Sequence, residues 1–479
     1  MKVMTKKWWA LSAVASGTFM ATLDSSIVNI ALPTITKELG EGLSISKWVI
    51  VIYLIVISGL LLPIGKISDL YGRRKVFALG LFIFALGSFF CGVSTSFKFL
   101  IFSRAIQGLG AAMLMANGPA IIATTFPSTE LGKALGTLAM VVSVGLISGP
   151  SLGGLIISQF GWREIFWINI PVAFLGILFV FKYIKKDPIK KKKFDFDWLG
   201  AFLQLLIVLL LIFIFDPPKI SVSGSSEFGL SRIIACGLIF IFTSIFLRIE
   251  LLSPDPLVDL ELLKNRNFLT GNLAGFFCFL FYSSVAVLMP FYLQDLRGFS
   301  PQTAGFYMTT IPLVIFITAP ITGRLSDQFG SKELSVLGSF IGGLTLFSVA
   351  GTFGGGIAKD SSSIFIVTFL LLIGLAMGVF QSPNNNAIMG SVPAHKLGLA
   401  SAMLATIRNM GMFVGVGLST QFFLYQYTKK NDYILALRFA FGFAAVYAIL
   451  AMIASSAKKR GPSWRKNNDG MEASTKKNH

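Results

Sequence analysis

The sequence predicts an all-α protein that crosses a membrane many times. Of its 479 residues, 54% are hydrophobic and only 13% are charged, against roughly 25% charged in an ordinary soluble domain. Apolar runs of about 20 residues, the length that spans a bilayer, recur along the whole chain. The polar residues are too few to cover a soluble globule of this size. A soluble enzyme, a disordered chain and a disulfide scaffold are therefore excluded.

Fourteen apolar runs are long enough to be membrane-spanning helices. The first is too long for a removed signal peptide, and it has no small-residue cleavage site. The runs lie at 8–32, 47–66, 76–96, 98–122, 132–158, 164–182, 198–215, 230–251, 268–293, 302–322, 334–352, 364–389, 398–425 and 434–457.

The charge distribution predicts the orientation of these spans. The chain has 41 Lys and Arg against 22 Asp and Glu, a net charge of +19. The basic residues concentrate in alternate connecting segments, on the same side of the membrane as the N-terminus. Both termini are therefore expected in the cytoplasm, with the chain in the cell membrane. This pattern indicates contact with a lipid bilayer and no nucleic-acid partner. The cysteines and histidines are isolated from one another, so no metal site is expected.

One motif occurs twice. Residues 65–72 read GKISDLYG and residues 323–330 read GRLSDQFG. The offset is longer than six spans require, so two extra spans lie between two six-span halves. We expect a six-helix bundle at 1–182, a basic cytoplasmic loop with two inserted helices at 183–267, a second bundle at 268–457 and a basic tail at 458–479. The inserted pair is expected at the periphery.

The fifth run carries small residues at regular spacing. Residues four apart lie on one helix face and allow a neighbouring helix to approach closely, and a proline can kink the helix. The alternative is generic small-residue packing. The residues are Gly136, Gly145, Gly149, Pro150, Gly153 and Gly154.

These motifs resemble those of the major facilitator superfamily, and within it the fourteen-span drug:proton antiporter branch. The resemblance implies two six-helix bundles around a central cavity, alternating access, and exchange of substrate for protons. The proton gradient would be the only driving force, with no cofactor. The repeated loop resembles a conformational latch, for which topology anchoring is the alternative. Its candidate residues are Gly65, Asp69, Gly72, Arg73, Arg74, Gly323, Asp327 and Gly330.

Two features of the latch loop have a direct physical basis. Gly65 and Gly72 permit a tight turn and a close helix approach. Asp69 can cap a helix N-terminus and pair with the arginines that follow it.

Asp24 is a candidate proton carrier. It lies nine residues before Pro33, about 13 Å along a helix, and is therefore deep in the membrane. A carboxylate at that depth must be paired or protonated. The alternative is a structural hydrogen bond to neighbouring Ser or Asn side chains.

Arg104 in the fourth run is the candidate partner of Asp24 in proton coupling. The resemblance implies this role, and snorkelling of Arg104 to the outer interface is the alternative. Polar residues inside other runs are expected to line the substrate cavity, although a helix–helix hydrogen-bond seam is the alternative for those in the twelfth. The cavity candidates are Asn29, Gln107, Gln381, Asn384, Asn385 and Arg408.

The expected function is proton-coupled efflux of a lipophilic small molecule or drug by a monomer. The phosphate-binding motif of an ATP-driven pump is missing from the sequence, and so are the signatures of an enzyme. The C-terminal half lacks a deep acid, which favours neutral or monovalent substrates over dications. The alternatives are a proton-coupled symporter, an exporter of one specific metabolite and, as a rival class, a membrane receptor.

Overall fold

A computed structural model describes residues 2–186, 197–215, 227–253, 257–351, 356–393 and 396–459 of the chain, and helices make up most of these ranges. The greater part of the predicted basic loop, and residues 460–479 of the predicted tail, lie outside the described residues.

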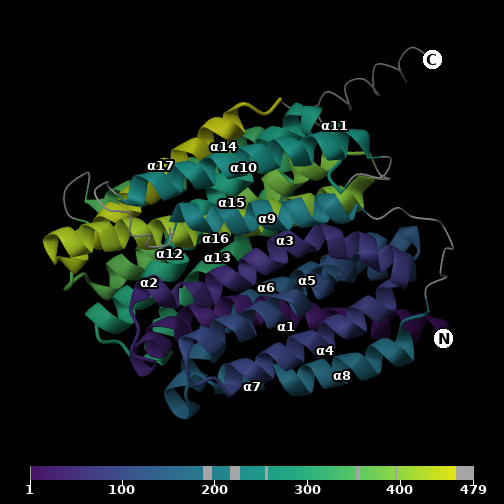
Figure 1. Ribbon diagram of the computed structural model, residues 1–479, viewed down its shortest axis with the longest axis horizontal. Helices are drawn as coiled ribbons and strands as arrows, with labels where there is room; N and C mark the ends of the chain where they lie inside the picture. Colours follow the sequence, from purple (N-terminus) through teal and green to yellow (C-terminus); the bar gives the residue numbers. More distant parts are fainter. Residues whose placement is uncertain are drawn as a thin grey trace, which may run out of the picture. The chain divides into compact units, whose positions relative to one another are not determined.

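The helices follow the predicted apolar runs closely (Figure 1). Their bounds in the first half are α1 Lys2–Glu38, α2 Leu43–Ser46, α3 Trp48–Tyr71, α4 Arg73–Gly92, α5 Phe97–Thr125, α6 Ser128–Phe160, α7 Glu164–Trp167 and α8 Asn169–Tyr183. The inserted pair is α9 Trp198–Phe215 and α10 Glu227–Leu252. The remaining elements are α11 Leu260–Lys264, α12 Arg266–Phe291, the π-helix η1 Tyr292–Leu296, α13 Pro301–Phe329, α14 Ser331–Ala350, α15 Ser363–Gly390, α16 Leu397–Lys430 and α17 Tyr433–Ser456.

The all-helical membrane fold predicted from the sequence is confirmed. In the described ranges, 13 helices are long and apolar enough to cross a membrane. The further predicted span corresponds to α9, whose apolar stretch Trp198–Leu211 is shorter. A total of fourteen spans therefore stays a prediction.

The chain divides into two compact units. Unit 1 is Met1–Leu260 with Val287–Phe306 and Val416–Gln421, and unit 2 is Glu261–Ala286, Tyr307–Gly415 and Phe422–His479. In unit 1, α1 packs against α5, α6 and α8, and α4 packs against α5 and α8. In unit 2, α14 packs against α15 and α17.

The two copies of the repeated motif adopt the same local structure. Gly72 and Gly330 have φ values of 94° and 93°, in the region that favours glycine, and they precede α4 and α14. Before each glycine, a serine hydroxyl donates to the carbonyl three residues earlier, from Ser68 to Gly65 at 2.6 Å and from Ser326 to Gly323 at 2.6 Å. The backbone at the two loops thus repeats as the sequence does.

The inserted pair packs on one helix of unit 1. Gln204 of α9 donates from Nε2 to the carbonyl of Ser58 at 3.3 Å, and α10 packs against α9. Near the end of α10, Glu250 is 3% exposed and accepts from the backbone N–H of Val258 at 3.0 Å. The sequence analysis passed over Glu250 because it stands at the end of an apolar run.

The end of α17 is fastened to three other helices of unit 2. Arg266 donates from Nε to the carbonyl of Ala457 at 2.7 Å. Lys458, just beyond the span, donates from Nζ to Oδ1 of Asn384 at 2.6 Å and to Oγ of Ser335 at 2.9 Å. Its side chain is 2% exposed, and burial lowers the pKa of this amine to about 7.

We predict that Lys458 makes stability pH-dependent. In the unfolded chain the lysine keeps a pKa of about 10.4. From about pH 7 to about pH 10 the unfolded state therefore binds more protons than the native state, and the free energy of unfolding rises with pH. In Lys458→Met this contribution is removed. The Tm of the purified wild type in detergent should rise relative to that of Lys458→Met across this range, and parallel profiles would contradict the prediction.

Candidate functional site

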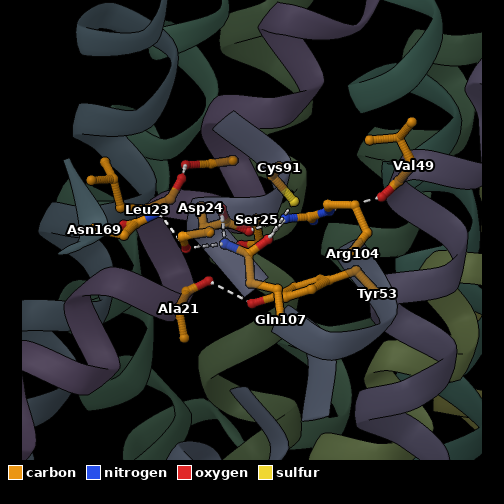
Figure 2. Close-up of polar contacts among 12 residues, drawn as sticks. Ala21, Leu23, Asp24, Ser25, Val49, Tyr53, Cys91, Arg104, Gln107 and Asn169 are labelled. Carbon is orange, nitrogen blue, oxygen red and sulfur yellow. Dashed lines mark hydrogen bonds and ion pairs between the residues drawn. The ribbon is translucent and has the colours of Figure 1, made fainter. Parts of the chain in front are cut away.

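Asp24 lies at the centre of a buried polar cluster in unit 1 (Figure 2). The carboxylate belongs to α1 and the residue is 1% exposed. Its Oδ2 accepts from Nη1 of Arg104 at 2.5 Å, and its Oδ1 accepts from Nε2 of Gln107 at 2.8 Å. The structure thus brings together the two residues that the sequence analysis paired for proton coupling.

Arg104 of α5 is held on all sides. Its Nε donates to the carbonyl of Val49 at 3.0 Å, and its guanidinium lies 4.1 Å from the ring centroid of Tyr53. The residue is 1% exposed, so the alternative of snorkelling to an interface is wrong. A guanidinium stays charged, and these contacts replace the water that it has lost.

Gln107 belongs to this cluster and is buried in it. Its Oε1 accepts from Nη1 of Arg104 at 2.5 Å, while its Nε2 also donates to Oγ of Ser88 at 2.8 Å. Asn169 of α8 donates to the same Ser88 oxygen at 3.4 Å. The sequence analysis placed Gln107 in the substrate cavity and missed the role of Ser88 and Tyr53 as neighbours. The available signal was a polar side chain inside an otherwise apolar run: Tyr53 in the second run, Ser88 in the third and Asn169 in the sixth.

The positive and negative charges of the cluster are equal in number. One carboxylate and one guanidinium form the ion pair, and neutral side chains satisfy most of their remaining hydrogen-bonding capacity. Removing one partner of such a pair leaves an uncompensated buried charge, at a cost of about 3–5 kcal/mol. Protonation of Asp24 would also remove the attraction that holds Arg104 to α1.

The glycines of α6 bring this helix onto α1. A Cβ at Gly145 would lie 2.3 Å from Oγ1 of Thr22, and one at Gly149 would lie 3.1 Å from the backbone nitrogen of Ile27. Thr22 and Ile27 lie on either side of Asp24 along α1. The close approach predicted from the four-residue spacing is present here.

Two other glycines of the same motif have contrasting surroundings. A Cβ at Gly154 would stand 2.4 Å from the carbonyl oxygen of Pro301, which is backbone and also part of unit 1. Gly136 has open space around the Cβ position, with no heavy atom within 4 Å. The motif therefore contains both a contact point and an open position.

The latch loop forms a local network in unit 1. Asp69 pairs with Nε of Arg73 at 2.9 Å, and Arg73 also donates to the carbonyl of Ala120 in α5 at 3.3 Å. Arg74 donates to the carbonyl of Phe181 in α8 at 2.5 Å. Asp69 does not cap a helix: it lies in the last turn of α3, and the N-cap position of α4 is Gly72.

The other latch glycines differ from expectation or stay as predicted. Gly65 has no heavy atom within 4 Å of a Cβ position, so it is not a point of close approach. A Cβ at Gly323 would lie 2.7 Å from Oγ of Ser382, within unit 2. The side chain of Asp327 is outside the described part of the structure, so its predicted role is not addressed.

The cavity candidates separate into two groups. Asn29 donates to the backbone carbonyl of Ser25 at 3.3 Å and makes no described hydrogen bond to Asp24. Gln381, Asn384, Asn385 and Arg408 all line one pocket of unit 2.

The apolar helices are those of a multi-pass membrane protein. The sequence pattern of the Major Facilitator Superfamily matches residues 14–416. This chain belongs to that superfamily, and it is a transporter and not an enzyme.

Curated relatives cover almost the whole chain. It is 35% identical over 458 residues to the "Riboflavin transporter RibZ" of Clostridioides difficile, covering 94% of this chain and 97% of the relative. It is 30% identical to the "Multidrug export protein EmrB" of Haemophilus influenzae, covering 85% and 79%. It is 28% identical to the "Multidrug resistance protein Stp" of Mycobacterium tuberculosis, covering 85% and 74%.

Solved structures share the fold at low sequence identity. The POT family transporter PepTSo superimposes with a TM-score of 0.67 at 16% identity, covering 94% of this chain and 97% of that one. The human organic anion transporter MFSD10 gives 0.62 at 16% identity, covering 94% and 99%.

The contrast between Gly154 and Gly136 gives a matched pair of substitutions on α6. Gly154→Ala places a methyl group against the backbone of Pro301, which must shift, at a cost of about 1–3 kcal/mol. Gly136→Ala meets open space and should be neutral or slightly stabilising. The Tm of the purified variants should fall for the first and not for the second. Equal Tm values would mean that this glycine contact is not built as described.

Proposed function

We propose that this protein exports lipophilic small molecules across the cell membrane in exchange for protons, with both termini in the cytoplasm. The observation that carries the proposal is the pairing of Asp24 with Arg104 inside unit 1. The spacing of Gly145, Gly149 and Gly153, which resembles that of antiporters, supports exchange over import. Relatives named as a multidrug export protein and a multidrug resistance protein point in the same direction.

In the proposed cycle, a proton from outside the cell neutralises Asp24. The salt bridge to Arg104 is lost, while Val49, Gln107 and the ring of Tyr53 continue to hold the guanidinium. The contact that ties α1 to α5 is then weaker, and the equilibrium between two conformations shifts. Release of the proton to the cytoplasm restores the pair. One protonation step thereby alternates the stability of two states without any cofactor.

The loop at 65–75 is proposed to hold one of these states. Its ion pair between Asp69 and Arg73 joins the end of α3 to α4, and Arg73 and Arg74 reach α5 and α8. Such a network can form in one state and break in the other.

An exporter of one specific metabolite is the second candidate. The observation in its favour is the similarity to a riboflavin transporter over 94% of the chain. Everted membrane vesicles energised by respiration separate the possibilities. An antiporter releases protons into the medium when its substrate is added, whereas a symporter does not. Applying riboflavin and a panel of lipophilic drugs to the same vesicles distinguishes a single metabolite from many compounds.

We predict that Asp24→Asn lowers the proton-driven accumulation of substrate by about tenfold or more, because the amide cannot carry the proton. Substrate binding in the absence of a gradient should persist. The measurement is uptake into proteoliposomes with an imposed pH gradient, alongside binding to the detergent-solubilised protein. Gradient-driven uptake by Asp24→Asn at the wild-type rate would disprove the role of this residue.

Loss of folding must be separated from loss of coupling in this test. Asp24→Asn leaves Arg104 buried without a counter-charge, which lowers stability. The double variant Asp24→Asn/Arg104→Gln removes both charges and should recover a Tm near that of the wild type. It should still fail to couple transport to the pH gradient.

For the latch, Asp69→Asn is expected to slow maximal transport severalfold while leaving the half-saturating substrate concentration unchanged. Asp69 is exposed in the last turn of α3 and pairs with Arg73. Its loss is therefore expected to affect the conformational change and not the binding of substrate. Initial rates over a range of substrate concentrations measure both quantities. A weaker affinity with an unchanged maximal rate would exclude the latch.

A further inference from the structure

Unit 2 contains a narrow pocket lined by α12, α15 and α16. Its polar lining consists of Asn272, Gln381, Asn384, Asn385 and Arg408. The free space at its centre is about 10 Å³, close to the least that one water-sized group needs. The pocket can therefore admit at most the tip of one small polar group of a ligand, and not its body.

Several of these polar groups have no partner in the described part of the chain. Asn272 is 4% exposed, its Nδ2 donates to the carbonyl of Phe268 at 2.9 Å, and its Oδ1 accepts no hydrogen bond. The guanidinium of Arg408 makes no described ion pair, and its contact with the ring of Phe279 is at 6.0 Å from the centroid. Unsatisfied polar groups inside a membrane protein are costly, so a polar occupant is favoured here.

Asn384 is fixed by its neighbours. Its Nδ2 donates to the carbonyl of Gly271 at 3.1 Å, and its Oδ1 accepts from Nζ of Lys458 at 2.6 Å. This amide therefore shapes the pocket but is not free to bind a ligand. Arg408 keeps open donors in the described part of the chain, as do the amides of Gln381 and Asn385, and the oxygen of Asn272 is a buried acceptor without a described partner.

The charge of the pocket has one sign. The three helices that line it contain no Asp or Glu at all. Arg408 is the charged residue of the described lining. A cationic ligand group would be repelled by Arg408 and would find no counter-charge on these helices.

We propose that this pocket recognises an anionic group of the substrate, a carboxylate or a deprotonated imide, through Arg408. Asn272 adds an acceptor for a neighbouring N–H or O–H of the same ligand. A guanidinium binds such planar groups through two parallel hydrogen bonds. This inference rests on the proposed transport function and deepens it, because it assigns the charge class of the substrate and disfavours lipophilic cations.

Two dyes with the same xanthene scaffold test the assignment. Fluorescein carries a carboxylate, whereas rhodamine 123 carries the corresponding methyl ester and a positive charge. Fluorescence anisotropy with the purified full chain at pH 7.5 measures both affinities without a proton gradient. We expect fluorescein to bind about tenfold or more tightly than rhodamine 123. Arg408→Gln should weaken fluorescein binding by about tenfold and leave rhodamine 123 binding unchanged or tighter.

Two further variants keep the test decisive. Arg408→Lys retains the positive charge and should recover part of the fluorescein affinity. Such a recovery would show that Arg408→Gln binds weakly because the charge is lost and not because the protein is misfolded. Arg438→Gln changes another arginine of unit 2, one that donates to the carbonyl of Ile357 at 2.9 Å and does not line the pocket. It should bind fluorescein as the wild type does.

Two results would overturn the proposal: equal wild-type affinities for the two dyes, or unchanged fluorescein binding in Arg408→Gln. The latter would mean that the pocket holds only water. Failure of the proposed proton coupling is distinguishable, since it would show as gradient-driven uptake by Asp24→Asn while the charge preference at equilibrium is retained.

Discussion

Asp24 and Arg104 stabilise each other inside the helix bundle, because an unpaired buried charge costs several kcal/mol. The pair joins α1 to α5, and its surroundings extend the connection to α3 and α4 through Val49, Tyr53 and Ser88. A change in the charge of one carboxylate therefore acts on four helices of unit 1 at once. In the proposed cycle, this is the physical link between a proton and a conformational change.

The position of Asp24 in turn depends on backbone contacts. α6 can lie against α1 because Gly145 and Gly149 leave room for Thr22 and for the backbone at Ile27. Larger side chains would push α1 away and lengthen the contacts of Asp24 with Arg104. The small-residue motif and the ion pair are consequently parts of one arrangement. Unit 2 differs, because its pocket carries the basic Arg408 without an acid on the helices that line it.

Much of this could be predicted from the sequence, because membrane depth can be counted along a helix. The depth of Asp24 could be counted, the pairing with Arg104 was implied by the family resemblance, and the repeated loop predicted the same backbone at Gly72 and Gly330. The place of Gln107 in the cluster could not be predicted, since an apolar run carries no periodicity that tells which face meets which neighbour. Lys458 was assigned to the basic tail. Its burial could not be predicted, because it depends on Asn384 and Ser335, which are far from it in sequence.

The most direct test of the account is to observe the proton on Asp24. Infrared difference spectroscopy of the purified protein, recorded between high and low pH with and without bound substrate, detects the carbonyl band of a protonated carboxylic acid. The account predicts a band that appears at low pH in the wild type, that substrate binding shifts to lower pH, and that Asp24→Asn lacks. A band unchanged in Asp24→Asn, or a wild-type carboxylate that stays ionised at every pH at which transport occurs, would contradict the claim that Asp24 carries the coupled proton.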